Sequence, residues 1–323
     1  MQPAKIWLSR YAKFVVAFTL LLISFGGTVT TKKAGLSVPD WPTSFGYNMF
    51  ALPFHLWEGD VFWEHSHRLI GSVMGVLIIG LVIWVMCTER RAWVKGLAWA
   101  SLVIVIIQGV MGGLRVTDLS IVLAIIHGCT AQFFFCLVLL IAMALSPEWT
   151  RPLATGVAPA RVASLKSWSW VVVGAIFIQL ILGAIMRHID AGLAIPTFPL
   201  TPEGTFMPRE HNLHVDIHFA HRFWAIVVTV LVGILVTKVF RNVASERRFS
   251  RPALTLVALL IVQIALGAAI IFTQRASHPT TSHVVNGALV LALGVVLAVR
   301  SNRFSTLDND QQPFSASAAP VEA

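Results

Sequence analysis

The sequence predicts an all-α membrane protein whose eight transmembrane helices form two pseudo-symmetric four-helix bundles. Three observations lead to this fold class: the composition, eight long apolar runs and an internal repeat. Of the 323 residues, 56% are hydrophobic and 12% are charged, whereas soluble globular domains carry roughly 25% charged residues. This composition excludes a soluble enzyme. It also excludes a disordered chain, because so apolar a chain has ample surface to bury.

The apolar runs are long enough to cross a bilayer, whose core requires about 20 apolar residues per helix. The first run follows three basic residues and is not followed by a small-residue cleavage site, so we expect it to remain as an uncleaved anchor. The three cysteines show no disulfide framework or paired metal motif. The eight runs centre near Leu22, Ile78, Ile104, Leu137, Ile178, Val230, Ile261 and Leu291.

The basic residues predict the orientation of the helices. Most of the 24 Lys and Arg residues fall in short clusters between apolar runs, and cytoplasmic loops are the ones that carry such clusters. We therefore expect a multi-pass protein of the inner (plasma) membrane with both termini in the cytoplasm, and no nucleic-acid partner. The clusters lie before Leu22, in segments 87–96, 146–167 and 238–251, and from Arg300 onwards.

Matching landmarks in the two halves of the chain indicate an internal repeat. The segment Gly35-Leu-Ser-Val-Pro39 recurs as Gly192-Leu-Ala-Ile-Pro196, His67-Arg68 as His221-Arg222, Gln108 with Gly112 as Gln263 with Gly267, and His127 as His283. A unit of four helices returns the chain to the same side, so the copies are parallel repeats. The predicted units are an N-terminal bundle (1–146), a cytoplasmic linker (147–167), a C-terminal bundle (168–300) and a disordered tail (301–323).

Four histidines are the main candidates for binding. His67, His127, His221 and His283 each lie within about two turns of the outer end of an even-numbered helix. Ionisable residues within membrane spans are costly, so each is a functional candidate. Two histidines on alternate helices of one bundle can face each other across its core, and opposed imidazoles of this kind are typical haem ligands in membrane cytochromes. We therefore predict two haem sites.

Two arginines and one carboxylate accompany these histidines. Arg68 and Arg222 directly follow candidate ligands, and a guanidinium could bind a haem propionate through a two-bond fork; the alternative is an arginine that extends to the membrane interface. Glu64 lies one turn before His67, whereas the matching residue in the second half is His218. An acid beside only one site suggests that this site performs chemistry. A helix-terminal acid that interacts with the helix dipole is the alternative.

These residues resemble those of the haem A synthases, membrane enzymes that oxidise haem O to haem A for haem-copper oxidases. The resemblance covers about residues 14–300. In one branch of that family the first outer loop carries a cysteine pair, but Val38 and Ser44 stand at those positions here, so the chain resembles the cysteine-free branch. The motifs are Glu64-x-x-His67-Arg68, His127-Gly128, Ala220-His221-Arg222, His283 with Asn286-Gly287, and Gly35-Leu-Ser-Val-Pro-Asp40-Trp41-Pro42.

The resemblance implies a role for each candidate. His67 and His127 would face the iron of the substrate haem O, His221 and His283 would ligate a haem b cofactor, and Glu64 would be the catalytic acidic residue. A methyl group of the substrate would become a formyl group. The implied partners are haem O synthase (a farnesyltransferase), an electron donor and membrane lipid, with a homo-oligomer as a possibility left open.

Three other readings are open at this point. A two-haem membrane cytochrome that only carries electrons would explain all four histidines, but not an acid at one site alone. A zinc or di-iron cluster could be formed by residues of one stretch, and a transporter would show helices broken at mid-membrane. The stretch for the metal cluster contains His211, His214, His218 and His221.

Overall fold

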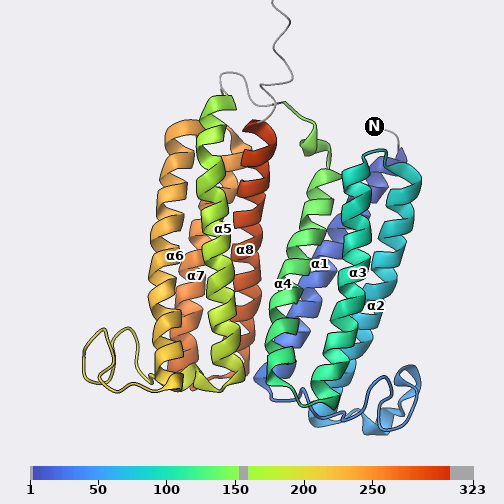
Figure 1. The fold of residues 1–323 in the computed structure, drawn as a ribbon, viewed down its shortest axis with the longest axis vertical. Helices are drawn as coiled ribbons and strands as arrows, with labels where there is room; N and C mark the ends of the chain where they lie inside the picture. The colour runs from blue at the N-terminus through green and yellow to red at the C-terminus, as the bar shows by residue number, and fades with distance from the viewer. Residues whose placement is uncertain (1–2, 153–158, 306–323) are drawn as a thin grey trace, which may run out of the picture.

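The computed structural model describes residues 3–152 and 159–305, which fold into eight long helices joined by loops (Figure 1). All eight helices are long and apolar enough to cross a membrane, and the described residues contain no β-strand. The predicted all-α membrane class is therefore confirmed. The helices are α1 (Pro3–Thr31), α2 (Gly59–Thr88), α3 (Ala92–Thr117), α4 (Ile121–Ala144), α5 (Pro159–His188), α6 (Leu213–Val243), α7 (Arg247–Phe272) and α8 (Ser277–Ser305).

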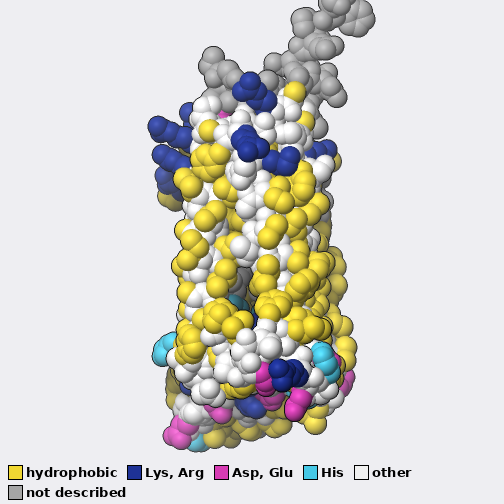
Figure 2. Space-filling model, turned by 90° about the vertical axis from the view of Figure 1, so that its left-hand side faces the viewer, with side chains coloured by type: hydrophobic (Ala, Val, Ile, Leu, Met, Phe, Trp, Pro, Cys, Tyr) yellow, Lys and Arg dark blue, Asp and Glu magenta, His cyan; other side chains and the backbone are white. Residues whose placement is uncertain are grey.

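The two ends of the molecule differ in connections and in charge. Helix α1 begins and α8 ends at one end, here called the terminal end, and the two long loops lie at the opposite end, here called the loop end (Figure 1). Figure 2 shows Lys and Arg side chains around the terminal end, a mixture of Asp, Glu and His with some Lys and Arg around the loop end, and an apolar belt between them. This pattern is typical of a membrane protein with a basic cytoplasmic side.

Helices α1 to α4 lie on one side of the molecule and α5 to α8 on the other (Figure 1). Helix α8 packs against α5 and α7 in its own set and against α1 and α4 in the other. In the most apolar stretch of α8, 61% is buried, against at most 33% in the corresponding stretch of any other helix. Helix α8 is therefore the central element. Helix α5 begins within the predicted linker 147–167, part of which lies outside the described residues. The division into two domains stays a prediction.

The end of α8 differs from the sequence expectation, which placed a disordered tail from residue 301. The helix continues to Ser305 because one face of its last turn, with Ser301 and Phe304, is buried. Ser301 lies 3.2 Å from the Ser169 hydroxyl oxygen, within hydrogen-bond distance, and the Phe304 side chain is 2% exposed. The expectation was therefore wrong for this turn, and the rest of the predicted tail lies outside the described residues.

The apolar core fills the terminal half of each helix set. The buried residues of α1 to α4 and those of α5 to α8 form two clusters that lie towards the terminal end. Close packing there leaves the loop half of the helices for polar groups. Large, fully buried members of the two clusters are Leu8, Met74, Ile78, Leu81, Ile141, Leu165, Leu235, Phe249, Leu256, Leu291 and Leu297.

The first long loop folds back over the loop end and inserts an aromatic ring. The ring of Trp41 lies against Gly113 of α3, so closely that a β-carbon built on Gly113 would lie 2.2 Å from Cδ2 of the tryptophan. Only glycine permits this approach, because any side chain would overlap the indole ring. The Trp41 side chain thus holds the first loop against α3 by packing on Gly113.

A methyl group at Gly113 should displace this loop. We expect Gly113→Ala to destabilise the protein by about 1–3 kcal/mol, the usual cost of overpacking, and to lower its thermal unfolding midpoint in detergent. Gly109→Ala, one turn away on the same helix, is the matched control because a β-carbon there meets no atom within 4 Å. Equal melting of the two variants would contradict the proposed fit of Trp41.

Candidate functional site

The described residues form a cavity of about 540 Å³ in the loop half of the molecule, lined by side chains from all eight helices. This volume falls within the usual range for ligand pockets. The cavity brings together all four predicted histidines, His67, His127, His221 and His283, although two separate sites were expected. Two pairs of candidate ligands therefore share one continuous space.

The histidines lie at matching depths because of where their helices begin. Asn212 caps α6 by accepting hydrogen bonds from the backbone N–H groups of His214 and Val215, and Ser120 caps α4 by accepting one from Leu123. Such caps satisfy backbone donors that lack a partner at a helix start. Each candidate histidine lies within about two turns of the first residue of its helix, as the sequence predicted.

Each candidate histidine packs against a glycine on the preceding helix. A β-carbon built on Gly26 of α1 would lie 3.0 Å from Cε1 of His67, and the same contact recurs in the other three helix pairs. The glycines let an imidazole lie between two helices without pushing them apart. The other pairs are Gly112 with His127 at 3.2 Å, Gly183 with His221 at 3.1 Å, and Gly267 with His283 at 3.4 Å.

The geometry of the second pair fits a shared metal. The ring centres of His221 and His283 are 6.4 Å apart. Two imidazoles on opposite sides of one metal ion, with metal–nitrogen bonds of about 2 Å, would have ring centres about 6 Å apart. The spacing therefore accommodates an iron between the rings.

Buried ring nitrogens point to the same conclusion. The Nδ1 atoms of His67, His127 and His283 are buried and have no hydrogen-bond partner in the structure. Buried polar atoms in proteins are nearly always satisfied, so an orphaned one indicates a missing water, ion or ligand. The residues present thus fit a haem: imidazoles for the iron, glycines beside the rings and an apolar wall.

Arg68 holds the first loop. Its guanidinium donates to the backbone oxygens of Asp40 at 2.7 Å, Thr43 at 3.2 Å and Val38 at 2.7 Å, and to the Glu64 carboxylate at 2.8 Å. These four hydrogen bonds occupy the guanidinium N–H groups that were expected, from the sequence, to bind a haem propionate. In this structure Arg68 anchors the loop over the cavity.

Arg222 has the equivalent position in the second half. It donates to the backbone oxygens of Ile195 at 2.9 Å and Thr197 at 2.7 Å, and its Nε lies 3.1 Å from Nε2 of His218. Unlike Arg68, Arg222 does not line the cavity. The paired Gly-Leu-x-x-Pro segments found in the sequence are thus the two loop segments that these arginines hold.

Glu64 and His218 also have the same structural place. Glu64 Oε2 accepts a hydrogen bond from the Val38 backbone N–H at 3.0 Å, and the Ile195 N–H lies 3.2 Å from Nδ1 of His218. Glu64 is 4% exposed and lines the cavity, whereas His218 does not. Glu64 and His218 therefore occupy equivalent positions in the two halves of the chain, and only Glu64 lines the cavity.

Three further cations line the cavity, and no sequence motif pointed to them. Arg115 donates to the Gly35 backbone oxygen at 2.8 Å, Arg187 of α5 donates to Thr31 Oγ1 of α1 at 2.5 Å and to the Gly27 backbone oxygen, and Arg275 is the third. The Nε of Arg187 is buried without a partner. Their places at the outer ends of odd-numbered helices were visible in the sequence, but their inward direction was not.

An ion-pair cluster links the two helix sets at the loop end. Asp190 lies 3.0 Å from both Lys33 Nζ and Arg275 Nη1. The hydrogen bond from Lys33, together with that from Arg275, holds the pKa of Asp190 below its usual range despite partial burial. Because Arg275 lines the cavity, this cluster joins the outer loops to the cavity wall.

Among the described residues, the other histidines of the second loop and the start of α6 do not form a metal site. His211 pairs with Asp216 at 2.7 Å on the surface, and His218 faces Ile195 and Arg222. No group of three or more His, Cys, Asp or Glu side chains suited to a metal ion is found among the described residues. The zinc or di-iron reading therefore has no support in this geometry.

One surface feature concerns access to the cavity. The face shown in Figure 2 has a narrow hollow towards the loop end of the apolar belt, with histidine atoms visible inside it.

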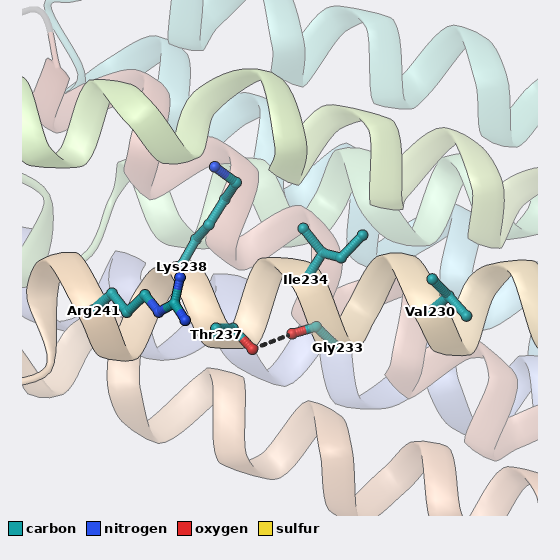
Figure 3. Close-up of a pocket in the computed structure, with 6 residues that line it drawn as sticks. All are labelled: Val230, Gly233, Ile234, Thr237, Lys238 and Arg241. Atoms are coloured by element: carbon teal, nitrogen blue, oxygen red, sulfur yellow. Dashed lines mark hydrogen bonds between the residues drawn. The ribbon is translucent and has the colours of Figure 1, made fainter.

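A second, shallow pocket of about 440 Å³ lies along α6 near the terminal end, where Lys238 and Arg241 border an apolar groove at Gly233 (Figure 3). No candidate histidine lines that second pocket.

Comparison with known proteins agrees with the site. The model of the COX15-CtaA family, described as cytochrome oxidase assembly protein, matches residues 9–295. Three similar curated proteins are each named heme A synthase. That of Geobacillus kaustophilus is 24% identical and covers 100% of both chains, that of Shewanella oneidensis is 26% identical over 88% of this chain and 93% of its own, and that of Sphingopyxis alaskensis is 25% identical over 93% of each. The chain is therefore a member of the COX15-CtaA family of cytochrome oxidase assembly proteins.

Proposed function

We propose that this protein is a haem A synthase, an oxidoreductase that converts a methyl group of haem O to a formyl group. The observation that carries the proposal is the asymmetry between Glu64 and His218, which places one acid on the wall of a cavity shared by two histidine pairs. The names of the similar proteins support it. An electron carrier would use both pairs alike and would not need the acid.

We assign the N-terminal pair, His67 and His127, to the substrate haem O and the C-terminal pair, His221 and His283, to a resident haem b. Haem iron supplies the redox chemistry when bound. The chain's own residues hold the rings and cover the site: Trp41, with its neighbours in the first loop, closes the loop end over the cavity. Exclusion of water strengthens electrostatic interactions inside.

Glu64 can act on the reacting group through its charge. Both of its oxygens accept hydrogen bonds, one from Arg68 at 2.8 Å and one from the Val38 N–H at 3.0 Å, so its position is held from two sides. A fixed negative charge in an enclosed cavity stabilises positive charge that develops on the substrate. We propose this role for Glu64, with Arg68 and the first loop as the groups that orient it.

We assign the haem propionates to the cavity cations Arg115 and Arg187 in place of Arg68 and Arg222. Arg187 reaches across from α5 to α1, and its Nε has no partner. An incoming carboxylate could take over the guanidinium from its present backbone and hydroxyl partners in a two-bond fork. The loop-anchoring arginines have their donors engaged by the loops already.

Arg187→Lys should weaken haem retention, because an ammonium cannot reproduce a planar two-bond fork. We expect a loss of about 1.5–3 kcal/mol in haem affinity, the scale for a hydrogen bond to a charged group, measured as haem per protein after purification. Arg209→Lys, in the exposed second loop, should leave retention unchanged. Full retention in Arg187→Lys would remove this assignment.

We further propose that the protein lies in the plasma membrane with both termini in the cytoplasm and that the lipid-facing hollow admits the farnesyl tail of haem O. The basic terminal end supports the orientation (Figure 2). Haem O synthase is the expected source of the substrate.

Production of haem A tests the proposed function directly. The chain is expressed in cells that make haem O and lack their own enzyme for its oxidation, and extracted haems are separated by chromatography. Haem A should appear only with the chain present. A pyridine haemochrome spectrum of the purified protein should show haem b together with haem O or haem A. Haem b alone, with no haem A in the cells, would favour the electron carrier.

A further inference from the structure

A glutamine precedes three of the four glycines that face the histidines. Helices α3, α5 and α7 carry the pattern Gln-x-x-x-Gly, which places both residues on one helix face, one turn apart. Helix α1 carries Leu22 at the matching place before Gly26. The three complete patterns are Gln108 with Gly112, Gln179 with Gly183, and Gln263 with Gly267.

Each glutamine reaches the histidine of the next helix. The Gln179 amide nitrogen lies 3.2 Å from Nδ1 and 3.3 Å from Nε2 of His221, and it donates to the His221 backbone oxygen at 3.0 Å. Gln263 lies 3.1 Å from Nε2 of His283, and its amide oxygen accepts a hydrogen bond from Asn286 at 2.7 Å. These amides can therefore restrain the two imidazoles of the C-terminal pair.

The N-terminal pair is restrained on one side only. Gln108 donates to the backbone oxygen of His127 at 3.3 Å, and its amide oxygen is buried without a partner, as is the His127 Nδ1. In the described part of the chain the His67 ring makes no hydrogen bond to a side chain, and it contacts Gly26 of the helix that carries Leu22. Among the described residues, the rings of His221 and His283 thus contact a glutamine amide and those of His67 and His127 do not, and His67 also lacks the backbone contact that His127 receives from Gln108.

We propose that Gln179 and Gln263 are positioning residues that orient the imidazole of the neighbouring helix, whereas Gln108 holds only the backbone of His127, and that His67 is the least restrained of the four candidate ligands. The inference rests on the proposed function, which makes these histidines haem ligands. A resident haem would then be held by two oriented imidazoles, whereas the substrate haem, which must arrive and leave, would meet two imidazoles that no glutamine orients, of which His67 also lacks a backbone contact of this kind.

The physical basis is the hydrogen bond to the ring nitrogen that does not face the metal. Such a partner fixes the tautomer of a ligating histidine and raises its basicity. An amide presents an oxygen as readily as a nitrogen, because its two ends are interchangeable by rotation. When haem binds, the Gln179 amide could turn over and give up its hydrogen bond to the His221 backbone oxygen; its oxygen, which has no partner at present, would then accept the Nδ1–H of His221 and stabilise the oxidised iron relative to the reduced iron.

The first test is a redox titration of haem b in the purified protein. Gln179→Leu should favour the reduced haem about tenfold, which corresponds to a rise of about 59 mV for a one-electron couple, and should change the low-spin electron paramagnetic resonance signal. Gln179→Glu, which keeps an acceptor, should not raise the potential. Gln274→Leu is the control, since this exposed glutamine lies outside the cavity lining and its amide donates to the Ile271 backbone oxygen.

The outcomes separate this inference from the proposed function. An unchanged potential and resonance signal in Gln179→Leu, with a bis-imidazole signal in the wild type, would overturn the positioning role alone. Absence of a bis-imidazole haem in the wild type would overturn the ligation, and the inference with it. If Gln179→Leu loses its haem while Gln179→Glu keeps it, the acceptor role is supported.

The second test adds the missing group. Leu22→Gln restores the Gln-x-x-x-Gly pattern to α1, so the protein should retain about tenfold more farnesylated haem through purification, within the usual range for partners of metal ligands. The amount of haem b should not change. Equal retention of farnesylated haem in wild type and Leu22→Gln would overturn the assignment of His67 as the least restrained ligand.

Discussion

Glu64→Gln should stop haem A formation while leaving haem b in place. Glutamine keeps the size of the side chain and an acceptor for the Val38 N–H, which Glu64 accepts at 3.0 Å. It removes the charge that faces the cavity and the ion pair with Arg68 at 2.8 Å. Loss of a charge-stabilising group typically costs about 10²–10³-fold in rate, and loss of a general acid or base about 10²–10⁴-fold.

The measurement is the ratio of haem A to haem O in cells whose only copy carries the substitution. Haem O or a partly oxidised intermediate should accumulate. Glu58→Gln, at the exposed start of α2, should leave the ratio unchanged, and Glu64→Asp should restore part of it if charge is the essential property. A wild-type ratio in Glu64→Gln would remove Glu64 from the mechanism, and with it the main argument against an electron carrier.

The second large effect is expected at the C-terminal histidine pair. His283→Ala should abolish or strongly reduce haem b in the purified protein, because one of two imidazoles with ring centres 6.4 Å apart is lost. His221→Ala should do the same. His278→Ala is a matched control on the same helix, since this histidine lies exposed in the first turn of α8. The haemochrome spectrum per mole of protein measures the effect.

Retention of haem b in His283→Ala with an unchanged spectrum would contradict the ligand assignment. A second measurement guards against misfolding: the thermal unfolding midpoint is measured for the wild type and for His283→Ala, each prepared with and without added haem. The midpoint of the wild type should rise with haem, and that of the variant should not. Anything that binds the native state alone stabilises it by mass action.

The sequence predicted the membrane class and the four histidines because both depend on local patterns. Runs of apolar residues specify spans whatever their neighbours are, since a helix satisfies its own backbone groups. The repeat in the sequence then showed which histidines correspond. The contacts of Arg68 and Arg222 with the loops could not be predicted in this way, because a residue's spacing along a helix does not show which backbone oxygens a distant loop will present.

Much of the candidate site was thus determined by the sequence alone: eight spans, paired histidines at one depth, and an acid in one half where the other has His218. Tertiary packing decided the rest. The apolar cores draw the terminal halves of the helices together, and four glycines admit the imidazoles in the loop half, so both histidine pairs open into one cavity. Arg187 enters that cavity only because α5 packs near α1. Such groups meet through contacts between residues far apart in the chain, and no local pattern encodes those contacts.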